Sequence, residues 1–247
     1  MDGFCLHCGR RLQHGTLIDL VVLTGAGVSA ESGLATFRDA GGLWEGQRPE
    51  DVATPQAFAR DPDLVHRFYN ARRAAAGEAT PNAAHSALAA LQDRLGERML
   101  LVTQNVDGLH EAAGHRGVIH MHGALNRATC GACGHRWAAP AVMETDDPCP
   151  SCGAPATRPD IVWFGEMPQE MERIYKALDA AHVFAAIGTS GLVYPAAGFV
   201  DVAASAGVLC HEINLAPGGN PTFHQLFSGP ATQAVPSWCA DVEALLG

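Results

Sequence analysis

The sequence predicts an α/β fold in which a doubly wound parallel sheet carries a small zinc ribbon and a helical insertion. Short, branched, apolar runs alternate with helix-like segments, as parallel strands alternate with their crossover helices. The first run, IDLVVLT, leads into the glycine turn GAG, which is how a buried parallel strand enters a turn. Four cysteines in two CxxC pairs interrupt the alternation, and their spacing is typical of a bound zinc ion.

Six apolar runs are expected as strands: Ile18–Thr24, Met99–Thr103, Val118–Met121, Ile161–Phe164, Val183–Ile187 and Val208–Asn214. The expected helices are Asn82–Leu95, Pro168–Ala181, Pro195–Ala206 and Cys239–Leu246. Residues 37–80 are expected to be loop with short helices, and residues 126–158 hold the four cysteines. We therefore expect a sheet lobe formed by 15–36, 81–125 and 159–247, an insertion over 37–80, a zinc-binding ribbon over 126–158 and an N-terminal extension over 1–14.

The composition favours a globular protein and disfavours nucleic acid and membranes as partners. Of the 247 residues 47% are hydrophobic and 17% charged, and the formal net charge is -10. A nucleic-acid-binding surface needs a basic stripe, and none is visible, whereas a lysine-bearing protein fits the negative charge. The sequence shows neither a signal-peptide core nor an apolar run of membrane-spanning length. The expected location is therefore cytoplasmic, where thiols or metal ligands are commoner than disulfides.

The cysteine quartet is the most specific motif. Cys130-x2-Cys133 is followed, after 15 intervening residues, by Cys149-x2-Cys152. Four thiolates fill the tetrahedral coordination of zinc and leave no open position, so the ion would be structural. Unpaired buried cysteines and two disulfides are the alternatives.

The other cysteines carry weaker signals. Cys5-x2-Cys8 resembles another metal knuckle but has no second half nearby. Cys210 lies in an apolar strand, and Cys239 stands at the expected start of the last helix, so both are expected to be structural. Only the quartet predicts a metal site.

The glycine turn after the first strand is close to a dinucleotide fingerprint. Its spacing is Gly25-x-Gly27-x-x-Ala30, and glycines let a backbone approach a pyrophosphate at a following helix N-terminus. A dehydrogenase would reach its second strand within about 30 residues. Here the next strand-like run begins at Met99, so the pattern indicates a dinucleotide pocket but not hydride transfer.

Polar residues gather where two further strands end. TQNVDGLH places four of them directly after a buried strand: Gln104, Asn105, Asp107 and His110. Ligands of open parallel sheets bind beyond the carboxyl ends of the strands, so a site is expected there. IHMHG adds His120 and His122, and histidine is the natural general base near neutral pH. Spacing alone does not choose between them.

From about Leu17 onward these motifs resemble those of the sirtuins, the NAD-dependent protein-lysine deacylases. The matching stretches are GAGVSAESG, FR at 37–38, TQNVDGLH, HG at 122–123, both CxxC pairs, PDIVWFGE at 159–166, GTS at 188–190 and INL at 213–215. GLATFR departs from the common family pattern, which has Ile-Pro-Asp before Phe-Arg, and GTSGLVYPA departs as well. The N-terminal CLHC has no family counterpart.

The resemblance implies a Rossmann-like NAD-binding lobe and a small zinc lobe, with NAD and an acyl-lysine protein substrate meeting between them. It makes His122, not His120, the general base, with Asn105 as the second catalytic residue. The cofactor-binding residues it implies are Gly25, Ala26, Gly27, Phe37, Arg38, Gln104, Asn105, Asp107, Gly188, Ser190, Asn214, Leu215 and Ala231, with backbone near Glu31. The substrate-binding residues it implies in the lysine channel and along the peptide are Val162, Phe164, Gly165 and Glu166, with Gly191 and Leu192 as a second peptide edge.

The chemistry that the resemblance implies releases nicotinamide and an O-acyl-ADP-ribose. The acyl oxygen attacks the ribose carbon and expels nicotinamide, and His122 then deprotonates a ribose hydroxyl. Because the base must be a neutral imidazole, activity should fall as the pH drops through the pKa of the histidine.

The stretch HRFYNARR and the motif DVATP resemble the sirtuin subgroup that removes succinyl and malonyl groups. In that subgroup the position of Ala53 is small and widens the acyl pocket, and Tyr69 and Arg72 would bind the distal carboxylate. Residues three apart share a helix face, and guanidinium matches carboxylate geometry. Arg67 and Arg73 are expected to be solvated. The alternative is a solvated helix whose arginines all face water.

Other functions stay open at this point. A general deacetylase would use the same catalytic residues, and an ADP-ribosyltransferase would use the same ribose chemistry. A catalytically quiet NAD-sensing module is disfavoured because Asn105, Asp107 and His122 occur together. The oligomeric state is not predicted, and a monomer is compatible with the sequence.

Overall fold

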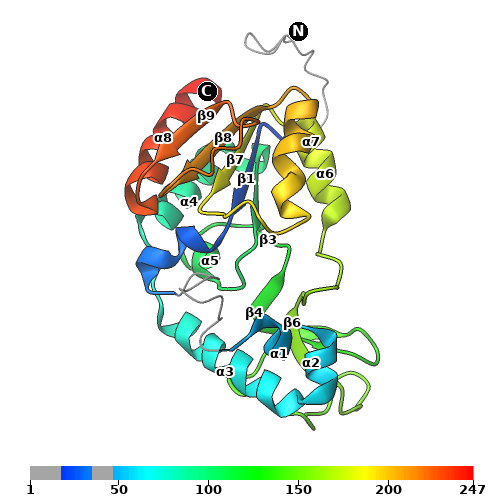
Figure 1. Cartoon of the computed structure of the whole chain (residues 1–247). Coiled ribbons are helices and arrows are strands. Elements are labelled where there is room, and N and C mark those ends of the chain that lie inside the picture. The colour runs from blue at the N-terminus through cyan, green and yellow to red at the C-terminus, as the bar shows by residue number, and fades with distance from the viewer. Residues whose placement is uncertain (1–17, 35–46, 247) are drawn as a thin grey trace.

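A six-stranded parallel sheet forms the larger of two lobes in the computed structural model, which describes residues 18–34 and 47–246 (Figure 1). Its order is β3-β2-β1-β7-β8-β9. The strands are β1 (Leu20–Thr24), β2 (Met99–Thr103), β3 (Ile119–His120), β7 (Val183–Ile187), β8 (Leu209–Asn214) and β9 (Gln225–Ser228). The predicted doubly wound sheet is confirmed, and the first excursion runs from β1 to β2 without a strand among the described residues.

Helices cover both faces of this sheet and explain why β1 is a continuous apolar run. All five residues of β1 are buried, since successive side chains point to opposite faces. Leu20 and Val22 pack with α4 (Ala83–Leu95) and α8 (Ala231–Leu246). Val21 and Leu23 pack with α6 (Met171–Ala180) and α7 (Phe199–Ser205), on the opposite face in Figure 1.

The structure corrects two of the expected elements and adds a strand that was not expected. Ile161–Phe164 is not a strand of the parallel sheet; β6 (Thr157–Ile161) belongs to the small sheet and the chain then leaves regular structure. The edge strand β9 was not expected, because its half-exposed residues lack a buried run. Helix α8 begins at Ala231, so Cys239 lies inside it; Pro236 within the helix made the predicted start too late.

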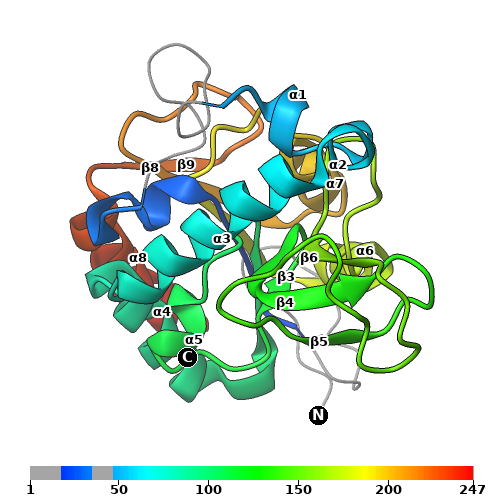
Figure 2. The ribbon, with the colours of Figure 1, turned by 90° about the horizontal axis from the view of Figure 1, so that it is seen from below.

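The smaller lobe combines an antiparallel sheet with a helical insertion. Its sheet has the order β5-β4-β6, with β4 (Gly123–Cys130) paired to β5 (Arg136–Ala138) and to β6. The insertion contains α1 (Pro49–Val52), α2 (Pro55–Arg60) and α3 (Pro62–Glu78). Helix α3 contacts β4 and β6 and lies beside them in Figure 2. Short helices were expected here, but α3 has 17 residues, begins with a proline at its first position and is capped by Asp61, which accepts from Leu64 N at 2.9 Å.

Helix α3 is held against the sheet of the smaller lobe by a separate apolar core and by Arg73. Phe68 and Tyr69 pack with Leu125 and Trp163 in that core. Arg73 was predicted to be solvated, and this is wrong: its Nε donates to the carbonyl of Leu125 at 2.6 Å, and burial lowers its pKa. The apolar packing and this hydrogen bond fix the position of α3 relative to β4.

The glycine turn after β1 lies directly against Gly188, which follows β7. Gly27 N donates to Gly188 O at 2.8 Å, and a Cβ on Gly188 would meet Val28 N at 2.5 Å. Residues with side chains do not fit at such distances. The φ of Gly188 is 60°, in the left-handed region that glycine tolerates.

We expect Gly188→Ala to lower the free energy of unfolding by about 2–4 kcal/mol, from the left-handed backbone and the overpacking together. Gly207→Ala is the matched control: Gly207 also has a positive φ, 76°, but a Cβ there meets nothing within 4 Å. It should cost only about 1 kcal/mol. Urea unfolding curves check both values, and equal losses would contradict the close approach.

In the described part of the chain, no helix combines the length and apolarity that crossing a membrane requires.

Candidate active site

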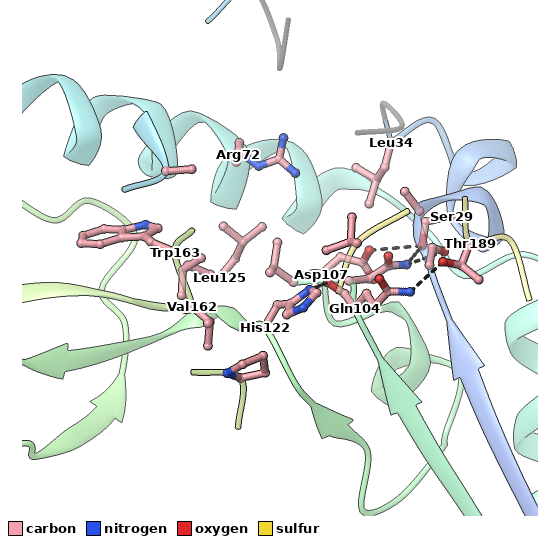
Figure 3. Close-up of a pocket in the computed structure, with 18 of the residues that line it drawn as sticks. Ser29, Leu34, Arg72, Gln104, Asp107, His122, Leu125, Val162, Trp163 and Thr189 are labelled. Carbon is pink, nitrogen blue, oxygen red and sulfur yellow. Dashed lines mark hydrogen bonds between the residues drawn. The ribbon is translucent and has the colours of Figure 1, made fainter. Parts of the chain in front are cut away.

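A cavity of about 460 Å³ lies where the two lobes meet (Figure 3). Its lining comes from the glycine turn after β1, the segments that follow β2 and β7, the β3–β4 turn, the loop after β6, and α3. The position agrees with the rule that ligands of open parallel sheets bind beyond the carboxyl ends of the strands. The predicted residues at the cavity are Gly25, Ala26, Gly27, Ala53, Tyr69, Arg72, Gln104, Asn105, Asp107, His122, Val162, Phe164, Gly165, Glu166, Gly188, Ser190 and Asn214.

Two short 3-10 turns, η1 (Ala26–Val28) and η2 (Ala30–Ser32), follow β1 where the fingerprint predicted a helix N-terminus. Gly25 N donates to Ile187 O at 2.9 Å, so the turn is tied to β7. Gly25, Ala26 and Gly27 all border the cavity. A Cβ on Gly25 or Gly27 would meet Gly188 O at 2.9 or 2.8 Å, so the close approach of the turn to the segment after β7 is what requires glycine at both positions.

Polar groups from the end of β2 form a buried network under the cavity. Asn105 Nδ2 donates to Gly25 O and to Ser29 Oγ, both at 3.2 Å, and Ser29 Oγ donates to Asp107 Oδ2 at 3.1 Å. Gln104 Nε2 donates to Thr189 Oγ1 at 2.9 Å. These bonds hold the amide and carboxylate groups in fixed orientations at the cavity wall. Ser29 and Thr189 were not singled out from the sequence, although they lie within the matched motifs GAGVSAESG and GTS.

His122 lies in the turn between β3 and β4 and borders the cavity. Its Nδ1 is 3.2 Å from Gln104 O, and because a carbonyl only accepts, Nδ1 carries the proton and Nε2 keeps its lone pair. Burial lowers the pKa of His122, and the bond to Gln104 opposes this shift. The imidazole is therefore neutral near pH 7 and can take a proton at Nε2.

His120 is differently placed. Its Nδ1 is 3.1 Å from Asn105 O and its Nε2 is 2.7 Å from Glu111 Oε1, so both ring nitrogens face acceptors. It is 5% exposed and is absent from the cavity lining. His110 is buried beside Thr24, 3.0 Å from its hydroxyl, and also lies outside the lining. Of the three histidines, only His122 can meet a ligand in this cavity.

The four cysteines of the quartet converge in the small lobe. Their sulfurs all lie within 4.8 Å of one another. The closest pairs, Cys130–Cys152 and Cys133–Cys149, are 3.7 and 3.8 Å apart, and a tetrahedron with the usual Zn–S bond of about 2.3 Å has edges of about 3.8 Å. Backbone N–H groups of Ala132 and Ser151 point at two of the sulfurs from 3.4 Å. The site therefore fits a structural zinc ion, which its four thiolates would hold.

Residues 25–195 match the family model described as the Sir2 family. This chain belongs to the Sir2 family. The sirtuin resemblance drawn from the motifs is therefore confirmed.

Individual Sir2 relatives match nearly the whole chain. The NAD-dependent protein deacylase of Shigella flexneri is 56% identical over 232 residues, covering 92% of this chain and 84% of the relative. A solved Sir2 homologue in complex with NAD has a TM-score of 0.82 and 40% identity, covering 92% of this chain and 90% of its own. A mutant Sir2 homologue in complex with 2'-O-acetyl ADP ribose has the same TM-score and identity, covering 92% of this chain and 93% of its own.

In this sirtuin the chain after β6 crosses the cavity between the lobes. Val162 N donates to His122 O at 2.9 Å, and Phe164 N donates to Ala53 O at 3.0 Å. Ala53 is only 3% exposed, and Gly165 has a φ of 91°. This segment is therefore bonded to the histidine turn on one side and to the helical insertion on the other.

Tyr69 and Arg72 of the Sir2 chain border the same cavity as His122. In Figure 3, Arg72 projects from α3 above His122 and Asp107, and all three residues belong to the lining of the cavity. The Tyr69 hydroxyl accepts a hydrogen bond from Trp163 Nε1 at 3.1 Å. Burial raises the pKa of Tyr69, so the phenol is neutral, while the nearby charge of Arg72 acts against that rise. Tyr69 and Arg72 thus bring one phenol and one guanidinium to the lining of the cavity.

The remaining predicted contacts of this sirtuin lie elsewhere. Phe37 and Arg38 lie outside the described residues, as do Cys5 and Cys8. Leu215 is 72% exposed, and neither it nor Ala231, the first residue of α8, borders the cavity. Trp163, which does border it, was quoted within a motif but given no role of its own.

Proposed function

We propose that this NAD-dependent protein deacylase removes succinyl and malonyl groups from lysine side chains of proteins, with some deacetylation, and forms nicotinamide and O-acyl-ADP-ribose. Family membership and a 56% identical NAD-dependent protein deacylase support the enzyme class. The Sir2 homologue complexed with 2'-O-acetyl ADP ribose supports the product class. The observation that carries the acidic preference is that Tyr69 and Arg72 border one cavity with His122.

The residues around the cavity have the chemistry to hold NAD. The glycine turn at Gly25–Gly27, which borders the cavity, suits a pyrophosphate. The fixed polar groups of Gln104, Asn105 and Asp107 suit a ribose and a carboxamide. NAD supplies the leaving nicotinamide and the ribose hydroxyls that accept the acyl group. His122 Nε2 takes a proton from such a hydroxyl, while its Nδ1–H stays on the carbonyl of Gln104.

The peptide that carries the acyl-lysine lies along the mouth of the cavity. Gly165 and Glu166, which border the cavity, and the exposed residues Gly191 and Leu192 would offer backbone to an extended chain. Leu192 is 60% exposed and Phe164 47% exposed, which suits residues that a bound peptide covers. The lysine side chain then enters between Val162 and Phe164 toward His122.

Arg72 gives the acyl pocket its charge preference. A guanidinium that forms a charge-assisted bond with a carboxylate in a partly desolvated pocket contributes about 1.5–3 kcal/mol. The neighbouring Tyr69 hydroxyl adds a second polar contact for the same group. An acetyl group has no carboxylate to offer Arg72, so it should be turned over less efficiently than a succinyl group.

The test compares succinyl-, malonyl- and acetyl-lysine peptides of one sequence with wild-type enzyme and Arg72→Met. We expect the substitution to abolish desuccinylation and demalonylation and to leave or raise deacetylation, because only the acidic groups use the guanidinium. Arg67→Met is the matched control, since Arg67 is exposed on the same helix, and its three relative rates should equal those of wild type. Unchanged relative rates in Arg72→Met would instead make the enzyme a general deacetylase.

A further inference from the structure

Trp163 connects the acyl pocket to an ion pair beneath it. The indole is 2% exposed, and its Nε1–H donates to the hydroxyl of Tyr69 at 3.1 Å, across 94 positions of sequence. The rings of Tyr69 and Trp163 lie with centroids 6.4 Å apart. In Figure 3 the indole lies below α3, on the far side of Leu125 from His122. It is therefore placed to touch the tyrosine rather than the reacting atoms.

The orientation of the indole is itself determined by charged neighbours. The guanidinium of Arg158 lies 3.5 Å from the centroid of the indole ring, in a cation–π contact. Glu166 binds that guanidinium through two bonds of 2.7 and 2.9 Å and also accepts from the backbone N–H of Trp163 at 2.9 Å. The contact with Arg158 and the bond from the Trp163 backbone to Glu166 thus fix the orientation of the indole ring, and with it the direction of its N–H. Because Glu166 neutralises Arg158, this arginine does not compete with Arg72 for an acidic acyl group.

We propose that Trp163 is a positioning residue for acyl selectivity, which acts by orienting the hydroxyl of Tyr69 toward the carboxylate of an acidic acyl group. An indole N–H only donates, so it occupies an acceptor lone pair of the phenol oxygen. The phenol proton must then point away from Trp163. Tyr69 is fully buried, and both it and Arg72 belong to the lining of the cavity. The proposal rests on the proposed function, since it concerns the same carboxylate.

The experiment is a double-mutant cycle of Trp163→Phe and Tyr69→Phe. Trp163→Phe keeps an aromatic ring over Arg158 and removes the N–H, and Tyr69→Phe removes the hydroxyl. The quantity measured is the selectivity ratio, kcat/KM for a succinyl peptide divided by kcat/KM for the acetyl peptide, in which any inactive protein cancels. We expect Trp163→Phe to lower this ratio about five-fold, the worth of one neutral hydrogen bond. The loss should lie in the KM of the succinyl peptide, because the carboxylate is bound in the ground state as well as in the transition state.

The coupling between the two substitutions in the selectivity ratio decides whether Trp163 acts through Tyr69. In the Tyr69→Phe background, Trp163→Phe should cause no further change in the ratio. An unchanged ratio in the single variant, or an additive loss in the double variant, overturns the proposal. Benzothienylalanine at position 163 replaces the N–H by sulfur at nearly constant shape, and it should reproduce the effect if Trp163→Phe folds poorly.

Trp238→Phe controls for loss of a buried indole. Trp238 is fully buried in α8, its Nε1 donates to His211 Nδ1 at 3.0 Å, and it lies outside the cavity lining. This variant should lose thermal stability yet keep the wild-type ratio; a lowered ratio would show that general destabilisation, not the bond to Tyr69, sets selectivity. A failure of the proposed function itself would give a different result. The wild-type enzyme would then have the same succinyl-to-acetyl selectivity ratio as Arg72→Met.

Discussion

His122→Ala is expected to abolish NAD-dependent deacylation of succinyl, malonyl and acetyl peptides alike. The substitution removes the only histidine whose free ring nitrogen borders the cavity among the described residues. A general base contributes about 10²–10⁴-fold to the rate, so kcat should fall by at least the lower figure. Nicotinamide release under saturating NAD and peptide measures the loss.

His120→Ala is the matched control for this substitution. His120 is two residues away and buried, but both of its ring nitrogens are bonded to Asn105 and Glu111. The variant should lose thermal stability and keep most of its kcat. NAD binding to His122→Ala should stay close to that of wild type, because the change removes a base and not a binding surface. Turnover by His122→Ala within tenfold of wild type would contradict the assignment.

The pH profile of the wild-type enzyme gives a second test of the same histidine. Burial lowers the pKa of His122 below the ordinary value of about 6.5, so the active neutral form persists to more acidic pH. The acid limb of kcat/KM should therefore have its midpoint below pH 6.5, with a plateau through neutrality. A midpoint above that value would mean that burial does not dominate at this site.

Loss of the zinc site is expected to have the second large effect. Cys149→Ser should release the metal and lower kcat/KM for all peptides by roughly 100-fold or more, since even outer-shell partners of a metal cost 10–100-fold. The reason is geometric: β4 starts directly after His122 and ends at the ligand Cys130. The neighbouring strand β6 ends at Ile161, next to Val162 in the lining of the cavity. The ribbon is therefore continuous with two segments that border the cavity.

Metal analysis and a second cysteine variant check this prediction. Wild type should contain one zinc per chain, and two would implicate Cys5 and Cys8. Cys239→Ala removes a buried thiol in α8, outside the cluster, and should keep both the zinc and the activity. A zinc-free Cys149→Ser protein with wild-type selectivity and rate would contradict a structural role for the ribbon.

The local sequence pattern was sufficient to predict an element or a site wherever it depends on a single strand or a single short motif. The apolar run Met99–Thr103 is β2 to the residue, because a strand covered on both faces needs a continuous apolar stretch. Each CxxC pair is a local knuckle, so its spacing alone predicted a cluster. Prediction failed where burial is partial, as in β9, and where a proline lies inside a helix, as Pro236 does in α8.

The sequence by itself therefore determined the alternating fold, the four-cysteine site, the set of polar residues at the strand ends and the Sir2 resemblance. Only the tertiary structure decided which histidine borders the cavity, that Arg73 is tied to Leu125 while Arg72 borders the cavity, and that Trp163 bonds to Tyr69. The physical reason is that strand and knuckle patterns depend on neighbours along the chain, whereas these roles depend on contacts between residues tens of positions apart. HRFYNARR reads locally as a basic helix, and only its packing against Leu125 and Trp163 assigns different roles to its tyrosine and its arginines.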